Sequence, residues 1–95
     1  MNVNEISVNG KRNKVEVILY SSPKCRYSEK TREFFREHNI EFIDYNVSAD
    51  YAKAKEMISL SGQAGVPVII ITRNGKTDIQ VGFDQEVLME AIFGH

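Results

Sequence analysis

The sequence predicts one α/β domain with a four-stranded mixed sheet flanked by three helices, in the order β-α-β-α-β-β-α. Three observations support this prediction: apolar runs that stop at turn residues, helix-length segments between the first three runs, and an Asn-Gly pair between the last two. Ninety-five residues leave room for only one core. We therefore expect residues 1–95 to form a single domain, in which residues 1–13 are either a leader or an extra edge strand.

The first strand and helix are predicted from Val15 to His38. Val15–Tyr20 is rich in β-formers and ends in an apolar stretch, which favours a strand buried on both faces. The turn residues Ser21–Pro23 stop this strand. A helix is expected from Cys25 to about His38, and Asn39 suits the left-handed conformation that often ends a helix.

A second strand and helix follow. Glu41–Asn46 alternates imperfectly between polar and apolar residues, as an exposed strand does. The next helix is expected from about Ala49 to Ser61, with Gly62 as its stop. Since a helix joins these two strands, a right-handed crossover makes them parallel. The predicted buried face of this second helix consists of Ala54, Met57, Ile58 and Ser61.

The last third of the chain predicts a hairpin and a helix. Val68–Thr72 is a short, continuously apolar strand, and Asn74-Gly75 is the strongest hairpin signal in the chain. Thr77–Val81 returns antiparallel, and Asp84 can cap the final helix. The predicted apolar stripe of that helix consists of Val87, Leu88, Ala91 and Ile92.

Other side chains divide into core and solvated positions. The expected core residues are Tyr20, Phe34, Phe35, Phe42, Met57, Ile70 and Met89. The charged residues expected on solvated helix faces are Arg32, Arg36, Lys53, Lys55 and Glu56.

Composition narrows the function class. With 12 basic and 13 acidic residues, the formal net charge is -1, so we expect no nucleic-acid partner and no membrane surface. The longest apolar run, Val66–Ile71, is too short to span a bilayer, and the first residues are mostly polar. These features predict a cytoplasmic monomer. His38 and His95 are isolated in sequence, and no metal site is expected.

The single cysteine occupies a reactive position. Cys25 follows a strand and a turn and stands at the first turn of a helix, where unpaired N–H groups and the helix dipole favour an anion. The basic neighbours Lys24 and Arg26 act in the same direction. The thiolate is the nucleophile in disulfide exchange, so a pKa below the free value of about 8.5 would make Cys25 reactive. The competing interpretation is a small buried hydrophobic residue.

Three motifs follow one another along the chain: the segment Ser21–Ser28, the pair Val66-Pro67 and the triplet Gly82-Phe83-Asp84. Together and in this order they resemble the glutaredoxin family, especially its small bacterial glutaredoxin-like branch. The similarity extends from Val15 to Phe93 and implies a thioredoxin-like (glutaredoxin) fold and thiol-disulfide oxidoreductase activity. Glutathione is the implied co-substrate, with no tightly bound cofactor. The implied partners are disulfide-containing or glutathionylated proteins.

The resemblance also implies roles for single residues. Cys25 matches the attacking cysteine, and Ser28 occupies the position of the resolving cysteine. The implied substrate- or glutathione-binding positions are Lys24, Tyr27, Val66, Pro67, Gly82, Phe83 and Asp84. In this interpretation Val66 offers its backbone to an extended peptide, and the bond before Pro67 is cis. Gly82 and Asp84 bring backbone amides towards a carboxylate, although Asp84 serves equally well as a plain helix cap.

Two departures from the family pattern change the expected mechanism. Ser28, native or engineered, excludes an intramolecular disulfide and leaves a monothiol route. Phe83 stands where many glutathione-using members have a second glycine. This side chain puts glutathione specificity in question and is compatible with reduction by a thioredoxin-type reductase instead.

Alternative functions remain open at this stage. The first is a non-catalytic thioredoxin-fold module that binds a peptide. A pKa of the Cys25 thiol near the free value would favour this alternative. The second is a monothiol module that bridges an Fe–S cluster, although Arg26 and Tyr27 differ from the Cys-Gly-Phe-Ser motif usual in that class. An arsenate-reductase-like fold ranks lowest, because that class usually has a longer chain.

Overall fold

The structure is a computed structural model that describes residues 3–8 and 11–94. Its elements, in chain order, are β1 (Val3–Val8), β2 (Lys11–Ser21), α1 (Arg26–Glu37), β3 (Ile43–Asn46), α2 (Tyr51–Ser61), β4 (Val68–Arg73), β5 (Lys76–Val81) and α3 (Gln85–Phe93). From β2 onward this is the predicted β-α-β-α-β-β-α order, and the predicted fold class is confirmed. Within the described ranges, no helix is long and apolar enough to cross a membrane.

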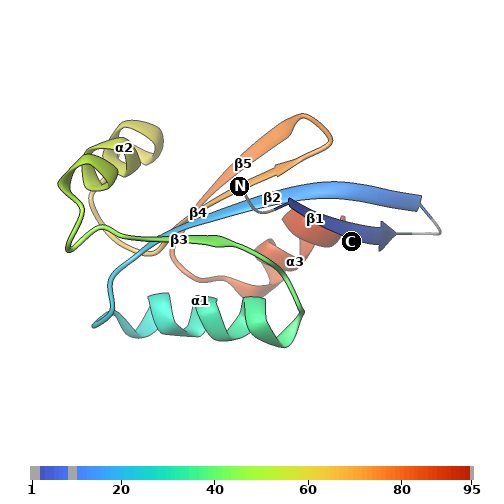
Figure 1. The fold of residues 1–95 in the computed structure, drawn as a ribbon, viewed down its shortest axis with the longest axis horizontal. Helices are drawn as coiled ribbons and strands as arrows, with labels where there is room; N and C mark the ends of the chain where they lie inside the picture. The colour runs from blue at the N-terminus through green and yellow to red at the C-terminus, as the bar shows by residue number, and fades with distance from the viewer. Residues whose placement is uncertain (1–2, 9–10, 95) are drawn as a thin grey trace.

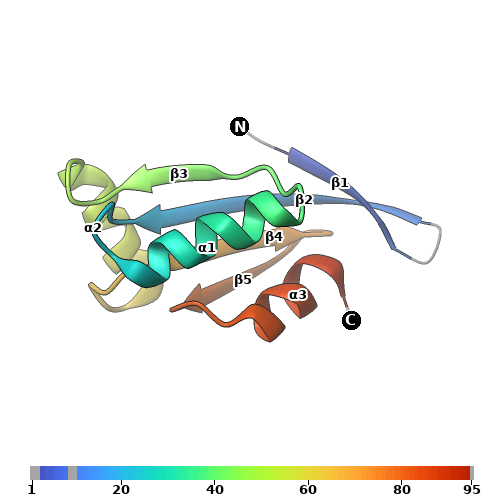
Figure 2. The same ribbon diagram turned by 90° about the horizontal axis from the view of Figure 1, so that it is seen from below.

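Strand β2 is the centre of the sheet. It pairs in parallel with β3 and antiparallel with β4, and β4 pairs antiparallel with β5. These four strands form the predicted mixed sheet. A fifth strand, β1, pairs antiparallel with Lys11–Glu16, whereas β3 pairs with Ile18–Ser21. Strands β1 and β3 therefore lie end to end along one edge of β2 (Figure 2). The pair Asn9-Gly10, whose residue types suit a turn between β1 and β2, lies outside the described residues.

The helices cover both faces of the sheet, with α1 and α3 on one face and α2 on the other (Figure 1). Side chains alternate along β2, so Val17 and Leu19 face α1 and α3, whereas Tyr20 faces α2. The buried cluster on the α1/α3 face consists of Val15, Val17, Leu19, Phe34, Phe35, Ile40, Ile69, Ile71, Leu88 and Ile92. The smaller cluster on the α2 face consists of Tyr20, Met57, Val68 and Ile70.

Local turn chemistry sets the ends of the elements. Asn39 after α1 and Gly62 after α2 have φ values of 54° and 75°, the left-handed conformation predicted for both. Asn74 and Gly75 have φ values of 53° and 79°, as a type I′ hairpin turn requires. The Val87 N–H donates to Asp84 Oδ1 at 3.2 Å, so Asp84 caps α3 as predicted.

Several predicted positions are corrected. Arg32 was expected on a solvated face, but it is only 9% exposed because polar groups of β2 and β3 surround it. Ile58 and Val87 were expected in buried stripes, yet they are 43% and 41% exposed. Helix α2 turns Met57 towards the sheet, and this leaves Ile58 at its margin. The strand predicted to begin at Glu41 begins at Ile43.

Candidate active site

Cys25 lies at the junction of β2 and α1. It is the N-cap residue of α1 and has extended backbone angles. Its N–H donates to the Ser22 carbonyl at 3.2 Å, which closes the turn after β2, and its carbonyl accepts from the Glu29 N–H at 3.1 Å. The side chain is half-buried. The sulfur is thus held at the positive end of the helix dipole while remaining accessible.

The environment of Cys25 favours the thiolate. A hydrogen bond from the Ser28 side chain lowers the pKa of Cys25 most, and backbone N–H groups of Ser28 and Tyr27 lower it further. Burial acts in the opposite direction, and the charge of Arg32 adds to the lowering. These donors belong to the first turn of α1, whose N–H groups have no partner within the helix. The site can therefore supply a nucleophilic thiolate.

Ser28 is fully buried, and its orientation is fixed from the other side. The Ser22 N–H donates to Ser28 Oγ at 3.3 Å. Because this oxygen already accepts a hydrogen bond, its hydroxyl proton is available to the sulfur of Cys25. Ser28 is thus built into the site as a donor.

The start of β4 lies opposite the sulfur. Cys25 Sγ lies 3.7 Å from the Val66 carbonyl oxygen, which gives the neutral thiol a hydrogen-bond acceptor. The Val66–Pro67 bond is cis, as the resemblance implies. The Gly82 N–H donates to the Pro67 carbonyl at 2.8 Å. The structure thus brings Cys25, Ser28, Val66 and Pro67 together, and it commits the amide of Gly82 to Pro67.

The remaining predicted residues lie around this centre in different ways. Lys24 and Tyr27 are exposed beside Cys25, and Tyr27 is 55% exposed, with Lys30 Nζ 5.6 Å from its ring centroid. Phe83 is half-buried and packs edge-on against Phe34 of α1, with the ring centroids 5.9 Å apart. Its ring therefore fills space between α1 and the start of α3.

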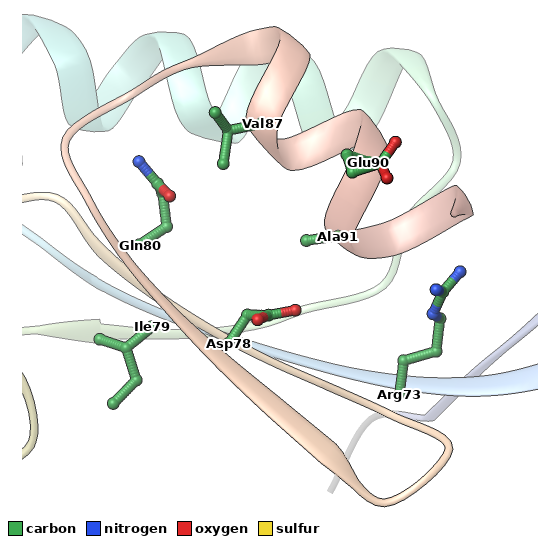
Figure 3. Close-up of a pocket in the computed structure, with 7 residues that line it drawn as sticks. All are labelled: Arg73, Asp78, Ile79, Gln80, Val87, Glu90 and Ala91. Atoms are coloured by element: carbon green, nitrogen blue, oxygen red, sulfur yellow. The ribbon is translucent and has the colours of Figure 1, made fainter. Parts of the chain in front are cut away.

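Two surface grooves are formed largely by other residues. One, of about 290 Å³, lies between β5 and α3 (Figure 3) and is lined by Arg73, Asp78, Ile79, Gln80, Val87, Glu90 and Ala91. The other, of about 250 Å³, is lined by Lys30, Glu33, Phe34, Glu37, Phe83 and Gln85. Cys25, Ser28, Val66 and Pro67 do not line these two grooves, whereas Phe83 lines the second.

Sequence reasoning missed a buried polar cluster beneath the cysteine turn. Arg32 Nε donates to Asp44 Oδ2 at 2.7 Å, and its Nη2 donates to Ser21 Oγ at 2.7 Å. Ser21 is fully buried and in turn donates to Asp44 Oδ1 at 2.5 Å. One signal was available: Arg32 is seven residues after Cys25, and two helical turns place both residues on one side of α1.

Two comparisons with known sequences identify the family of this chain. The sequence model of the glutaredoxin family matches residues 17–76. An uncharacterized glutaredoxin-like 8.6 kDa protein in a rubredoxin operon of Clostridium pasteurianum is 46% identical over 67 residues, which cover 70% of this chain and 84% of that protein.

Solved structures show the same fold at lower identity. A glutaredoxin from Archaeoglobus fulgidus superposes with a TM-score of 0.67 at 23% identity, covering 81% of this chain and 85% of that one. Methanoredoxin from Methanosarcina acetivorans has a TM-score of 0.70 at 20% identity, covering 84% and 85%. NrdH-redoxin from Escherichia coli has a TM-score of 0.62 at 20% identity, covering 77% and 90%.

A thioredoxin-like fold, a thiolate-favouring cysteine at the start of α1 and the match to the family sequence model agree with one another. This chain belongs to the glutaredoxin family of redox thiol proteins.

Proposed function

We propose that this protein is a monothiol thiol-disulfide oxidoreductase that uses glutathione as co-substrate. The observation that carries the proposal is the Cys25 thiol, whose pKa is lowered by Ser28 and by backbone N–H groups, in a chain with no second cysteine. A lowered pKa provides thiolate at neutral pH, and thiolate is the species that attacks disulfides.

The proposed reaction has two exchange steps. The Cys25 thiolate attacks the glutathione sulfur of a glutathionylated protein, so a Cys25–glutathione disulfide forms and the substrate leaves as a thiolate that takes up a proton. The thiolate of a second glutathione then attacks the glutathione sulfur of this mixed disulfide. Oxidised glutathione leaves, and Cys25 returns as a thiolate. Over the two steps, one glutathione thiol is oxidised and forms a disulfide with the glutathione that came from the substrate, while the substrate sulfur is reduced to a thiol. Ser28 takes no part in bond exchange.

We assign the binding roles to residues around the sulfur. The backbone of Val66 pairs with the extended glutathione peptide, and the exposed ring of Tyr27 flanks it. Lys24 is placed to attract a glutathione carboxylate. The start of α3, at Phe83 and Asp84, supplies amides at a helix N-terminus for the other carboxylate. Gly82 contributes by shape, because its N–H is bonded to Pro67.

A thioredoxin-type reductase is the second candidate electron source. Two observations favour it: the Gly82 amide is engaged within the protein, and Phe83 occupies the position of a second glycine. The NrdH-redoxin from Escherichia coli is itself described as a glutaredoxin-like protein with a thioredoxin-like activity profile. In this variant the reductase thiolate would resolve the mixed disulfide in place of the second glutathione.

The decisive experiment combines adduct formation with turnover. The reduced protein is exposed to oxidised glutathione and its intact mass is measured. It is then assayed for deglutathionylation of a model peptide with either glutathione or a thioredoxin reductase system as reductant. Cys25→Ser is the negative control, and Ser28→Cys tests whether a second thiol adds a dithiol route.

Each result has a defined meaning. One glutathione adduct, released by added glutathione and lost in Cys25→Ser, supports the monothiol route. Turnover with the reductase system alone shifts the assignment to the second candidate. No adduct and no turnover with either reductant would overturn the catalytic proposal and leave a peptide-binding module.

A further inference from the structure

The cluster around Arg32 has an organisation that the proposed reaction does not yet explain. Among residues 15–94, Arg32 is the one charged residue whose side chain is buried. Its guanidinium reaches three elements: Glu29 on α1 at 3.1 Å, Asp44 on β3 at 2.7 Å and Ser21 on β2 at 2.7 Å. Burying a charge is costly unless it is paired and hydrogen-bonded, so this arrangement needs a reason beyond filling space.

The contacts of Arg32 continue into the cysteine turn. Besides Ser21, Nη2 approaches the Ser22 carbonyl oxygen at 3.5 Å, and the same oxygen accepts the Cys25 N–H at 3.2 Å. Arg32 therefore holds Ser21 by its side chain and Ser22 by its backbone. These two residues connect the end of β2 to Cys25.

Ser22 passes this constraint to the sulfur. Its N–H donates to Ser28 Oγ, which leaves the Ser28 hydroxyl proton directed to Cys25. Contacts thus lead from Arg32 to the Ser22 carbonyl and from the Ser22 N–H to Ser28 Oγ, and the Ser28 side chain lowers the pKa of Cys25 most. Rotation of the Ser21–Ser22 peptide would disturb the donor on which the thiolate most depends.

We propose that Arg32 is a positioning residue for thiol exchange at Cys25, because its guanidinium holds the Ser21 side chain and the Ser22 carbonyl, fixes the backbone between them, and thereby orients the Ser28 hydroxyl towards the sulfur. This inference rests on the proposed function only in naming Cys25 as the reacting group.

The charge of Arg32 and its hydrogen-bonding geometry are separable contributions. The carboxylates of Glu29 and Asp44 pair with the guanidinium, while Lys24 and Arg26 flank Cys25 from the exposed side. A guanidinium can hold Ser21, Ser22 and Asp44 at once because its donors form a rigid fork, whereas an ammonium is a single point charge. Substitution by lysine should therefore keep the charge and lose the positioning.

The test measures the alkylation rate of Cys25 by iodoacetamide as a function of pH, a readout that needs no glutathione. Arg32→Met removes the charge and the fork, and Arg32→Lys keeps the charge alone. The matched control is Arg36→Met, one turn further along α1, since Arg36 is exposed and also contacts Glu29 at 3.6 Å. We expect Arg32→Met to react about three- to tenfold more slowly at neutral pH, with its pH midpoint raised. Arg32→Lys should recover only part of this loss, and Arg36→Met should match the wild type.

Ser21→Ala is the second variant, in case Arg32→Met does not fold. It removes the hydroxyl between Arg32 and Asp44 without adding or deleting a charge, and we expect a smaller shift in the same direction. A folded Arg32→Met with the wild-type midpoint would overturn the inference, as would full recovery in Arg32→Lys. If only Ser21→Ala folds, an unchanged midpoint in that variant has the same meaning. A protein that shows the shift but no glutathione turnover would refute the proposed function and leave this inference standing.

Discussion

The two faces of the sheet are closed in different ways. On the α1/α3 face, nine apolar residues from two helices and two strands, together with Ile40, form one buried cluster. On the α2 face, the buried cluster has four residues, and polar contacts supplement it. The Tyr20 hydroxyl donates to Glu56 at 2.5 Å, and Lys53 bonds to the same carboxylate while lying 4.2 Å from the Tyr45 ring centroid.

The α2 face is also only partly covered. Ile79 and Val81 of β5 lie opposite Ile70 and Val68, so they point to this face, yet they are 43% and 47% exposed. Helix α2 packs near the carboxyl end of β2, close to the cysteine turn, and leaves the rest of the face open (Figure 1). We infer that the α1/α3 face supplies most of the stability, whereas the α2 face holds a short helix beside the site by a few specific contacts.

The largest loss of stability is expected for a substitution on the α1/α3 face. Phe35 is fully buried, and Phe35→Ala should cost about 3–5 kcal/mol because it removes apolar contacts and leaves a cavity. Urea unfolding followed by circular dichroism measures this loss. A loss near zero would show that the α1/α3 face does not dominate the stability.

A smaller loss is expected from Met57, the buried residue of α2. Met57→Ala should cost about 2–3 kcal/mol, at the low end for such a change, because partly exposed neighbours can relax into the space. The same unfolding assay applies. A loss equal to that of Phe35→Ala would remove the contrast between the faces.

Tyr20→Phe tests the polar part of the α2 face. It keeps the buried ring and deletes the hydroxyl bound to Glu56, so we expect a loss of about 1–2 kcal/mol at neutral pH. The hydrogen bond from the Tyr20 hydroxyl is the largest single cause that lowers the pKa of Glu56, and Lys53 lowers it further. This contribution is therefore complete above the ordinary glutamate pKa of about 4.3 and is lost as the pH falls through the lower pKa of the folded state.

Unfolding curves of both proteins, measured from neutral pH to below this window, should converge in acid. Glu56→Gln, which cannot ionise, should remove the pH-dependent part of the difference. A difference between wild type and Tyr20→Phe that stays constant through the window would exclude Glu56 as the partner.

The smallest loss of stability is expected for a substitution on the part of the α2 face that helix α2 leaves uncovered. Ile79→Thr keeps a β-branched side chain at a position 43% exposed and should cost less than about 1 kcal/mol. Ile71→Thr, at a fully buried position of β4, is the matched control and should cost clearly more. Equal losses would mean that the open side is covered in solution.

The fold was predictable where local chemistry decides it. Asn39, Gly62 and the pair Asn74-Gly75 signal their turns through the conformations that these residue types tolerate, so most element boundaries were correctly placed. The apolar stretch at the end of β2 similarly predicted a strand buried on both faces, and its side chains enter both buried clusters.

The candidate site was predictable only along the chain. The position of Cys25 before a helix and the motif around Pro67 are sequence features, whereas the burial of Arg32 depends on Ser21 and Asp44, which other elements bring to it. A charged residue on a helix is usually solvated, and no local pattern marks the exception. The predicted burial of Ile58 was wrong for a related reason, because helical spacing does not indicate how much of the sheet a short helix covers.

The pairing of β2 predicts that its two ends differ in amide hydrogen exchange. Lys11–Lys14 pair with β1 on one edge, while the pairing of β4 with the other edge begins at Val15. Strand β3 pairs separately, from Ile18. The pairing between β1 and Lys11–Lys14 can therefore open without breaking any hydrogen bond of β3. Amides of Lys11–Lys14 should then exchange through local opening. Amides from Ile18 to Tyr20, enclosed by β3 and β4, should exchange only when the whole domain unfolds.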